Sequence, residues 1–268
     1  MPIVNNHIKQ AFFSLVFISF CSAAIAKSTA QWFEASRFGD TWTLSSMMFA
    51  GTDINTRDER GNTALHQALV EPSPAAVAWL IRQPGIDLNA RNGVGETALM
   101  QAIIHGHSEI AQTLLRAGAA VNQTGWTPLH YAAASKKPDS PKFVRLLLEQ
   151  YSAYIDAESP NGTTPLMMAA RYGLTESVNV LIEAGADLEV KNKQGLTALD
   201  FARSSEHPDS TKRVEAAFAK LAREQALARA QAQAAAKPTE PPLEPAAVMP
   251  VIGGTQSLEF ETIPKGQW

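Results

Sequence analysis

A short motif recurs five times between residues 63 and 202, and this repetition constrains the fold more than any other feature of the 268-residue chain. Each copy begins with threonine, carries leucine two residues later and ends in alanine. The copies are Thr63–Ala68, Thr97–Ala102, Thr127–Ala132, Thr164–Ala169 and Thr197–Ala202. Successive copies begin 30 to 37 residues apart. A repeat of this length marks a unit that cannot bury its apolar face alone. The pattern therefore predicts a stack in which each unit covers its neighbour.

The threonine spacings of 34, 30, 37 and 33 residues reduce to one repeat length. A second landmark precedes each threonine, at Asp53–Asn55, Asp87–Asn89, Ala120–Asn122, Tyr154–Asp156 and Asp187–Glu189. The steps from the end of each landmark to the next threonine are 8, 8, 5, 8 and 8 residues. The unit is therefore 33 residues long. The third copy lacks three loop residues before Thr127, and four extra residues fall within 135–143.

Each unit is predicted to form a pair of helices. Thr63 is a suitable N-cap, and Pro128 suits the first turn of the corresponding helix in its own unit. Leu65 and Ala68 fall on one face at helical spacing, and the small alanine allows a neighbouring helix to approach. These features predict a short first helix that packs on its neighbours through one apolar face.

The second helix of each pair is predicted from residues such as 108–118, in which Ile110, Leu114 and Leu115 form the apolar face. Ser73–Pro74 and Ser140–Pro141 are typical of a cap followed by a first-turn proline. Gly118 and Gly185 are predicted to end second helices in the left-handed conformation.

The sequence Thr-Pro-Leu-His-x-Ala at this period resembles the ankyrin repeat. Leu114–Ala119 and Leu181–Asp187 resemble the end of that family's second helix and the turn after it. The resemblance covers about residues 31–222, or roughly six units with two degenerate caps. Departures are Ala for Pro at 64, 98 and 198, Met for His at 100 and 167, and Asp200 for His.

The resemblance implies an all-α fold, an α-solenoid of helix pairs joined by short hairpin loops. It also implies that His66 and His130 bond to loop backbone and have a structural role. We expect the repeat domain to span residues 27–222. Within it, Trp32, Phe33, Phe38, Leu44 and Phe49 are expected to form the N-terminal cap, and Val214, Phe218 and Leu221 are expected to close the last repeat.

Residues 1–26 are predicted to be a cleaved signal peptide. One basic residue, Lys9, precedes an apolar run at 11–20, and Ala24–Ala26 is a small-x-small cleavage site. The run is about half the length needed to cross ~30 Å of hydrocarbon. A buried N-terminal helix is the alternative. Phe20 before Cys21 argues against lipidation, so we expect a periplasmic protein, or an extracellular one as the alternative.

The sequence after the repeats changes in composition. Residues 223–236 are predicted to form an extended alanine-rich helix, and residues 237–268, with six prolines, a disordered tail. The more hydrophobic end at 257–268 reads either as a frayed tail or as a docking motif. No segment after the signal is long and apolar enough to span a membrane.

Composition and motifs argue against several function classes. The net charge of −3 does not favour a nucleic-acid binder. One cysteine excludes an intramolecular disulfide framework. No nucleophile elbow, phosphate-binding loop or metalloprotease motif is present, so we expect no catalytic residue, no cofactor and no enzyme activity. His105 and His107 do not complete a metal site. Asp58 and Glu59 are expected to be solvated residues of a turn.

The expected function is to bind a partner protein in a concave groove of hairpin tips and first helices, as a monomer. Trp126, Tyr131, Arg171 and Tyr172 are predicted to form a central anchor, since aromatic residues and arginine dominate binding hot spots. Arg60, Glu96, His105 and Asn161 are predicted to line the groove with Ser135 and Thr163. Alternatively, Trp126 covers the shortened loop. A secreted effector and a toxin-neutralising immunity protein are the other candidate functions.

Overall fold

The computed structural model describes residues 29–235. The predicted signal peptide (1–26) and the predicted tail (237–268) lie outside the described residues. All regular secondary structure between residues 29 and 235 is helical, without a strand. This confirms the all-α ankyrin-type fold within that range.

The described helices form six consecutive pairs. Residues 29–38 are helical and precede α2 (Thr41–Phe49). The first helices of the following pairs are α3 (Ala64–Gln67), α5 (Ala98–His105), α7 (Pro128–Ala134), α9 (Pro165–Arg171) and α11 (Ala198–Arg203). The second helices are α4 (Pro74–Leu80), α6 (Ser108–Arg116), α8 (Ser140–Glu149), α10 (Thr175–Glu183) and α12 (Pro208–Ala235).

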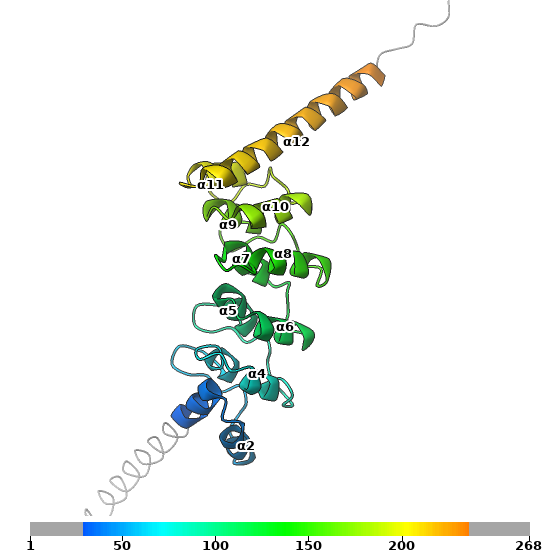
Figure 1. Cartoon of the computed structure of the whole chain (residues 1–268). Coiled ribbons are helices and arrows are strands. Elements are labelled where there is room, and N and C mark those ends of the chain that lie inside the picture. The colour runs from blue at the N-terminus through cyan, green and yellow to red at the C-terminus, as the bar shows by residue number, and fades with distance from the viewer. Residues whose placement is uncertain (1–28, 236–268) are drawn as a thin grey trace, which may run out of the picture. The chain divides into compact units, whose positions relative to one another are not determined.

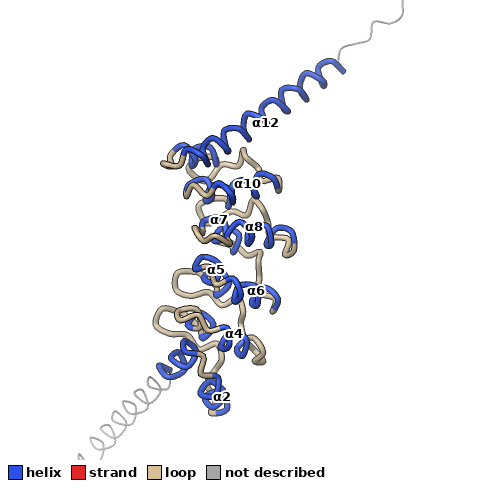
Figure 2. The backbone as a smooth tube through the Cα atoms, viewed as in Figure 1, coloured by secondary structure: helices blue, strands red, loops and turns tan. Residues whose placement is uncertain are grey.

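The pairs up to residue 223 stack in chain order, so that like helices lie beside like helices (Figures 1 and 2). In the row of first helices, α5 packs on α7, α7 on α9 and α9 on α11. In the row of second helices, α4 packs on α6 and α8 on α10. The loops between units form the hairpin tips on the side of the first helices (Figure 2).

The threonine of each motif is the N-cap that the sequence predicts. The Thr97 hydroxyl accepts a hydrogen bond from the Met100 N–H at 3.3 Å, and the Ser73 hydroxyl accepts one from Ala76 N–H at the same distance. Gly118 and Gly185 have φ angles of 93° and 89°, which confirms the predicted left-handed ends.

The prediction for Ser140 was wrong by one residue. Asp139 is the N-cap of α8, and Ser140 is its first residue, buried in the stack. The Ser140 N–H donates to the Lys137 carbonyl at 3.0 Å, so a turn within the inserted residues starts the helix early.

The core is a continuous layer between the two rows of helices. Leu65, Ala68, Ile110, Leu114 and Leu115 are buried as predicted. A fully buried leucine stabilises a fold by about 1.5–3 kcal/mol. The alanine at the end of each motif is also buried, and this lets adjacent first helices approach closely.

The caps only partly follow the prediction. Trp32, Phe33 and Leu44 are buried, but Phe38 is exposed and Phe49 is 98% exposed. The reason is that α2 turns Leu44 toward the stack, which leaves Phe49 on its outer side. At the other end Val214 is buried, and Phe218 and Leu221 pack on the core, as predicted.

Helix α12 runs without interruption from Pro208 to Ala235. The chain divides into two compact units after Arg223. The described part of the second unit is helical, and its one large apolar side chain, Leu227, is exposed. Among residues 29–235, no helix combines the length and the hydropathy required to cross a membrane.

Candidate protein-binding site

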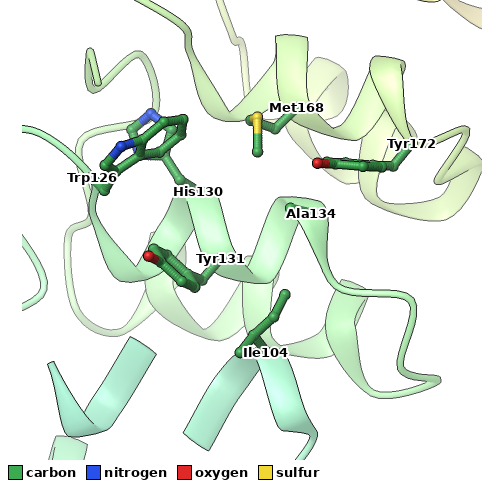
Figure 3. Close-up of a pocket in the computed structure, with 7 residues that line it drawn as sticks. All are labelled: Ile104, Trp126, His130, Tyr131, Ala134, Met168 and Tyr172. Atoms are coloured by element: carbon green, nitrogen blue, oxygen red, sulfur yellow. The ribbon is translucent and has the colours of Figure 1, made fainter. Parts of the chain in front are cut away.

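An aromatic pocket opens on the row of first helices at the middle of the stack. Its volume is about 240 Å³. Figure 3 shows its lining, which comes from α5, the loop before α7, α7 itself and α9 with its C-cap. The lining residues are Ile104, Trp126, His130, Tyr131, Ala134, Met168 and Tyr172. We call this cavity the aromatic pocket.

The shortened loop places Trp126 at the wall of this pocket. Trp126 directly precedes Thr127, the N-cap of α7, and is half-buried. Its ring meets the ring of His130 edge to face, with centroids 5.2 Å apart and an interplanar angle of 79°. Such a T-shaped contact is a favourable aromatic geometry.

His130 is a rigid support for Trp126 because both its ring nitrogens are engaged. The Thr127 N–H donates to Nδ1 at 3.2 Å, so Nε2 carries the proton and donates to the Thr163 carbonyl at 2.9 Å. Burial lowers the pKa of His130, which keeps the ring neutral near pH 7. His66 donates in the same way to the Glu96 carbonyl at 3.0 Å. The structural role of both histidines is confirmed.

The polar edge of the pocket is formed by Tyr131 and Glu96. The Tyr131 hydroxyl donates to a Glu96 carboxylate oxygen at 3.1 Å, and Gln101 donates to the other oxygen at 3.1 Å. Burial, with the negative charge of Glu96, raises the pKa of the Tyr131 phenol. Tyr131 therefore stays a neutral hydrogen-bond donor.

The structure brings together three of the four residues predicted to form the anchor. Trp126, Tyr131 and Tyr172 line the aromatic pocket, and Tyr172 is 38% exposed. Arg171 is exposed but points toward the next unit, where its guanidinium carbon lies 6.0 Å from the centre of the Phe201 ring.

The other predicted groove residues occupy different places. Glu96 reaches the pocket through Tyr131, and His105 is exposed at the end of α5 with its ring 6.0 Å from that of His107. Arg60 is exposed in the first hairpin, and Asn161 is exposed in the fourth, where it accepts a hydrogen bond from Ser159. Arg60 and Asn161 do not line the aromatic pocket.

Ser135 and Thr163 were wrongly predicted to face the groove. Each is only 2% exposed. The Ser135 hydroxyl donates to the Ile104 carbonyl at 3.4 Å, and the Thr163 N–H donates to the Ser159 hydroxyl at 2.9 Å. Both residues are therefore part of the links between and within units.

Sequence reasoning missed Met168, although a signal for it was present. Met168 occupies the fifth position of the motif, the same position as Tyr131. Along the stack this position holds Gln67, Gln101, Tyr131, Met168 and Phe201. The fifth position thus changes from glutamine in the first two copies of the motif to larger aromatic or apolar side chains in the last three.

A second, more polar cavity of about 610 Å³ lies at the N-terminal end of the groove, and Arg37, Arg57 and Arg60 are among its lining residues. Asp58 in its wall accepts hydrogen bonds from Asn62 and Gln67. Burial acts to raise the pKa of Asp58, but these hydrogen bonds outweigh it and lower the pKa overall. Asp58 therefore shapes the turn, as predicted, although it is less solvated than expected.

The described residues contain no cluster of three or more histidine, cysteine or acidic side chains that could hold a metal ion. The pair His105 and His107 thus has no third protein ligand within residues 29–235.

Helix pairs that repeat every 33 residues and pack like on like define a helical-repeat protein with an open binding face. Family models for "Ankyrin repeats (3 copies)" match residues 32–124 and 71–158, and one for "Ankyrin repeats (many copies)" matches residues 146–202. The chain belongs to the ankyrin-repeat family.

The similarity to curated proteins covers part of the chain and a small share of each relative. The chain is 45% identical over 80 residues to the neurogenic locus notch homolog protein 4 of Homo sapiens. This match covers 29% of this chain and 4% of that protein. It is 33% identical over 159 residues to the nuclear factor NF-kappa-B p105 subunit of Gallus gallus, covering 57% of this chain and 16% of that protein. The chain therefore spans a small part of these relatives.

Two solved structures are similar over most of their own length. One is a chain from the complex of the Bd0816 predatory endopeptidase of Bdellovibrio bacteriovorus with immunity protein Bd3460, at 32% identity and a TM-score of 0.57. The match covers 69% of this chain and 96% of that chain. The other is the ankyrin repeat domain of Bcl-3, at 32% identity and a TM-score of 0.51. This match covers 61% of this chain and 72% of that chain.

Proposed function

We propose that this protein is a non-catalytic interaction module that binds a partner protein through the groove of its ankyrin stack. The observation that carries the proposal is the aromatic pocket, in which side chains from three consecutive units surround one apolar cavity. Ankyrin repeats mediate protein–protein interaction, and this pocket is the place in the described groove best suited to an apolar anchor.

The pocket favours binding because it is formed before the partner arrives. The edge-to-face contact with the His130 ring holds Trp126 in place, and a hydrogen bond to Glu96 holds Tyr131. A preorganised surface loses little side-chain entropy on association. Burying one large apolar side chain of a partner contributes about 1.5–3 kcal/mol.

The test compares two tryptophan substitutions. Trp126→Ala removes a wall of the pocket, whereas Trp42→Ala removes an exposed tryptophan of α2 outside it. We expect Trp126→Ala to weaken partner capture at least tenfold, as for a hot-spot residue, with little change in Tm. Trp42→Ala should leave capture intact. A Trp126→Ala protein that melts earlier yet captures its partner normally would show that Trp126 only covers the shortened loop.

We further propose that the module works in the periplasm. The support is the composition of residues 1–26, with a short apolar run before a small-x-small site. Expression of the full chain in a bacterium, followed by fractionation and N-terminal sequencing, tests this. A mature protein that begins at Lys27 in the periplasmic fraction is expected. An uncleaved chain in the cytoplasm would contradict the proposal, and a cleaved chain in the medium would favour the extracellular alternative.

A second candidate function is neutralisation of a hydrolase, as an immunity protein. It is favoured by the similarity to a chain from an endopeptidase–immunity protein complex, of which 96% is covered. The test is to measure a periplasmic hydrolase that co-purifies with the chain, with and without added wild-type or Trp126→Ala protein. Inhibition by the wild type alone supports this role. A hydrolase that stays fully active when bound argues for a different kind of partner.

A further inference from the structure

The first helices around the aromatic pocket end in a row of basic residues. Helix α5 ends at His105, α9 ends at Arg171, and Lys136 and Lys137 follow α7. All four are exposed. Because α7 packs between α5 and α9, these helix ends lie next to one another along one side of the groove. We call His105, Lys136, Lys137 and Arg171 the basic edge.

The charges of the basic edge are not neutralised within the described part of the chain. None of its lysine or arginine side chains forms an ion pair with a residue between 29 and 235. Asp139 lies nearby, but Lys142 and Ser108 hold its carboxylate at 2.9 and 3.1 Å. Arg203, at the end of α11, is paired with Glu215 at 3.1 Å and is therefore not part of the edge.

The positive groups at this edge are close enough to influence one another. The Lys137 side chain crosses the turn at Gly106, where an added Cβ would lie 2.9 Å from its Cγ. It therefore passes beside His105 and His107. Burial lowers the pKa of His107, and the neighbouring basic side chains of His105 and Lys137 lower it further.

The basic edge adjoins the aromatic pocket along the chain. His105 follows Ile104 and Arg171 precedes Tyr172, and Ile104 and Tyr172 both line the pocket. The Arg171 side chain itself lies over the Phe201 ring, 6.0 Å from its centre. On the other side of the pocket, the Glu96 carboxylate holds the Tyr131 hydroxyl. Around the pocket, basic residues therefore lie at the helix ends, and toward the hairpin tips the Glu96 carboxylate is accompanied by Arg91, whose positive charge also acts on Tyr131.

We propose that the groove takes a partner segment in which one large apolar side chain fills the aromatic pocket and neighbouring aspartate or glutamate residues lie over the basic edge. This inference rests on the proposed function and adds the chemistry of the partner. Charge complementarity supports it, because unpaired lysine and arginine beside an apolar cavity attract an acidic segment and repel a basic one.

The experiment has to separate partner binding from an effect of the basic edge on the stability of the fold. Cations at the C-terminal end of a helix interact favourably with its dipole, so they also stabilise the fold. Charge reversal could then change stability without any partner. Binding and Tm are therefore measured on the same variants, and the salt dependence of binding is measured as well, since exposed charges are screened.

The experiment uses the purified full-length chain and an unbiased peptide library displayed on phage. The expected result is enrichment of peptides with a large apolar residue next to aspartate or glutamate. Their affinity should fall at least tenfold for Lys137→Glu/Arg171→Glu and should weaken with rising salt. The control Arg116→Glu/Lys212→Glu makes the same change in net charge on exposed residues of second helices, and it should bind like the wild type.

Each other outcome overturns the inference. Enriched peptides without acidic residues overturn it, as does undiminished binding to Lys137→Glu/Arg171→Glu. If those peptides still lose binding to Trp126→Ala, the proposed function stands and only the acidic partner is wrong. If Trp126→Ala also binds them normally, or if no peptide is enriched, the proposed function fails with it. A lower Tm of the charge-reversed variant with unchanged peptide affinity assigns the cations to helix stability alone.

Discussion

The Nε2 atom of His130 lies 2.9 Å from the carbonyl oxygen of Thr163, a residue of the following unit. The same bond joins His66 to the Glu96 carbonyl at 3.0 Å. At the equivalent position the second and fourth units carry Met100 and Met167, whose sulfur atoms accept only from the local threonine N–H at 3.4 Å. Side-chain links of this kind therefore alternate along the stack.

We predict that His130→Met lowers the free energy of unfolding by about 1–3 kcal/mol, because it removes a buried hydrogen bond and leaves the Thr163 carbonyl without this donor. Methionine is the residue that the chain itself uses at this position elsewhere, so the substitution conserves packing. Urea unfolding monitored by circular dichroism measures the change. His105→Met, at an exposed site, should alter the value by less than about 0.5 kcal/mol. Equal stability of the two variants would show that the bond contributes nothing.

The stability of the protein should also fall as the pH is lowered through the ordinary pKa of histidine, about 6.5. Burial lowers the pKa of both His66 and His130 in the folded state. The unfolded chain therefore binds protons more readily between the folded and unfolded pKa values. Stability is complete above the unfolded pKa and is lost as the pH falls. Each histidine contributes a slope of up to about 1.4 kcal/mol per pH unit.

Unfolding free energies measured between about pH 7.5 and 5.5 check this dependence. His130→Met should unfold with a shallower pH slope than the wild type, since it lacks one of the histidines whose pKa is lowered in the folded state. A slope that is identical in both proteins would mean that His130 is not responsible.

Asp156→Asn is expected to stabilise the protein at pH 7 by about 1 kcal/mol. Asp156 stands where other units have asparagine, and its carboxylate accepts from the Asp187 N–H at 3.1 Å. Asn122 accepts the equivalent bond from Tyr154 at 2.8 Å and also donates to the Ser152 carbonyl at 2.9 Å. An aspartate cannot make that second bond.

The pH dependence of this gain follows from the titration of Asp156. Burial, with the charge of Asp187, raises the pKa of Asp156, so its ionised form disfavours the folded state as the pH rises through the folded pKa. The gain from asparagine should thus shrink toward about pH 4. Urea unfolding at several pH values measures it, with Glu206→Gln as an exposed charge-removal control. If the stability gained by Asp156→Asn did not vary with pH, the charge of Asp156 would not be the cause of the gain.

Gly173→Ala should destabilise the stack more than Gly185→Ala. Both glycines have a positive φ, 68° and 89°, so an added Cβ costs about 1 kcal/mol at either position. At Gly173 the Cβ would also overlap the ring and the Cβ of His207, whereas nothing lies within 4 Å at Gly185. We expect a clear difference in Tm between the variants. Gly173→Ala/His207→Gly, which also removes the Cβ of residue 207, should recover most of that difference, and failure to do so would exclude the His207 side chain as its cause.

Much of the fold could be predicted because each unit repeats the same local rules. The motif threonine caps a helix, the leucine and alanine fall on one face, and the glycine after the second helix needs no Cβ. These signals act over a few residues, so they are visible in the sequence. Phe49 shows the limit, because its apolar character predicted burial, whereas the side of α2 that faces the stack is decided by packing.

The candidate site shows the same division. Trp126, Tyr131 and Tyr172 were predicted from residue type and repeat position, and the structure places them around one cavity. Arg171 was predicted with them but lies over the Phe201 ring. Met168 was overlooked because methionine in a repeat motif reads as core, although it faces the groove.

By itself the sequence determined the repeat length, the helix pairs, their caps and the shortened third loop, because these depend on contacts within one unit. Only the tertiary structure decided which side chains of different units meet. The hydrogen bond from Tyr131 to Glu96, the reach of His130 to Thr163 and the separation of Arg171 from the aromatic pocket depend on how one unit is rotated on the next. That rotation arises from packing summed over the whole interface, and no short motif encodes it.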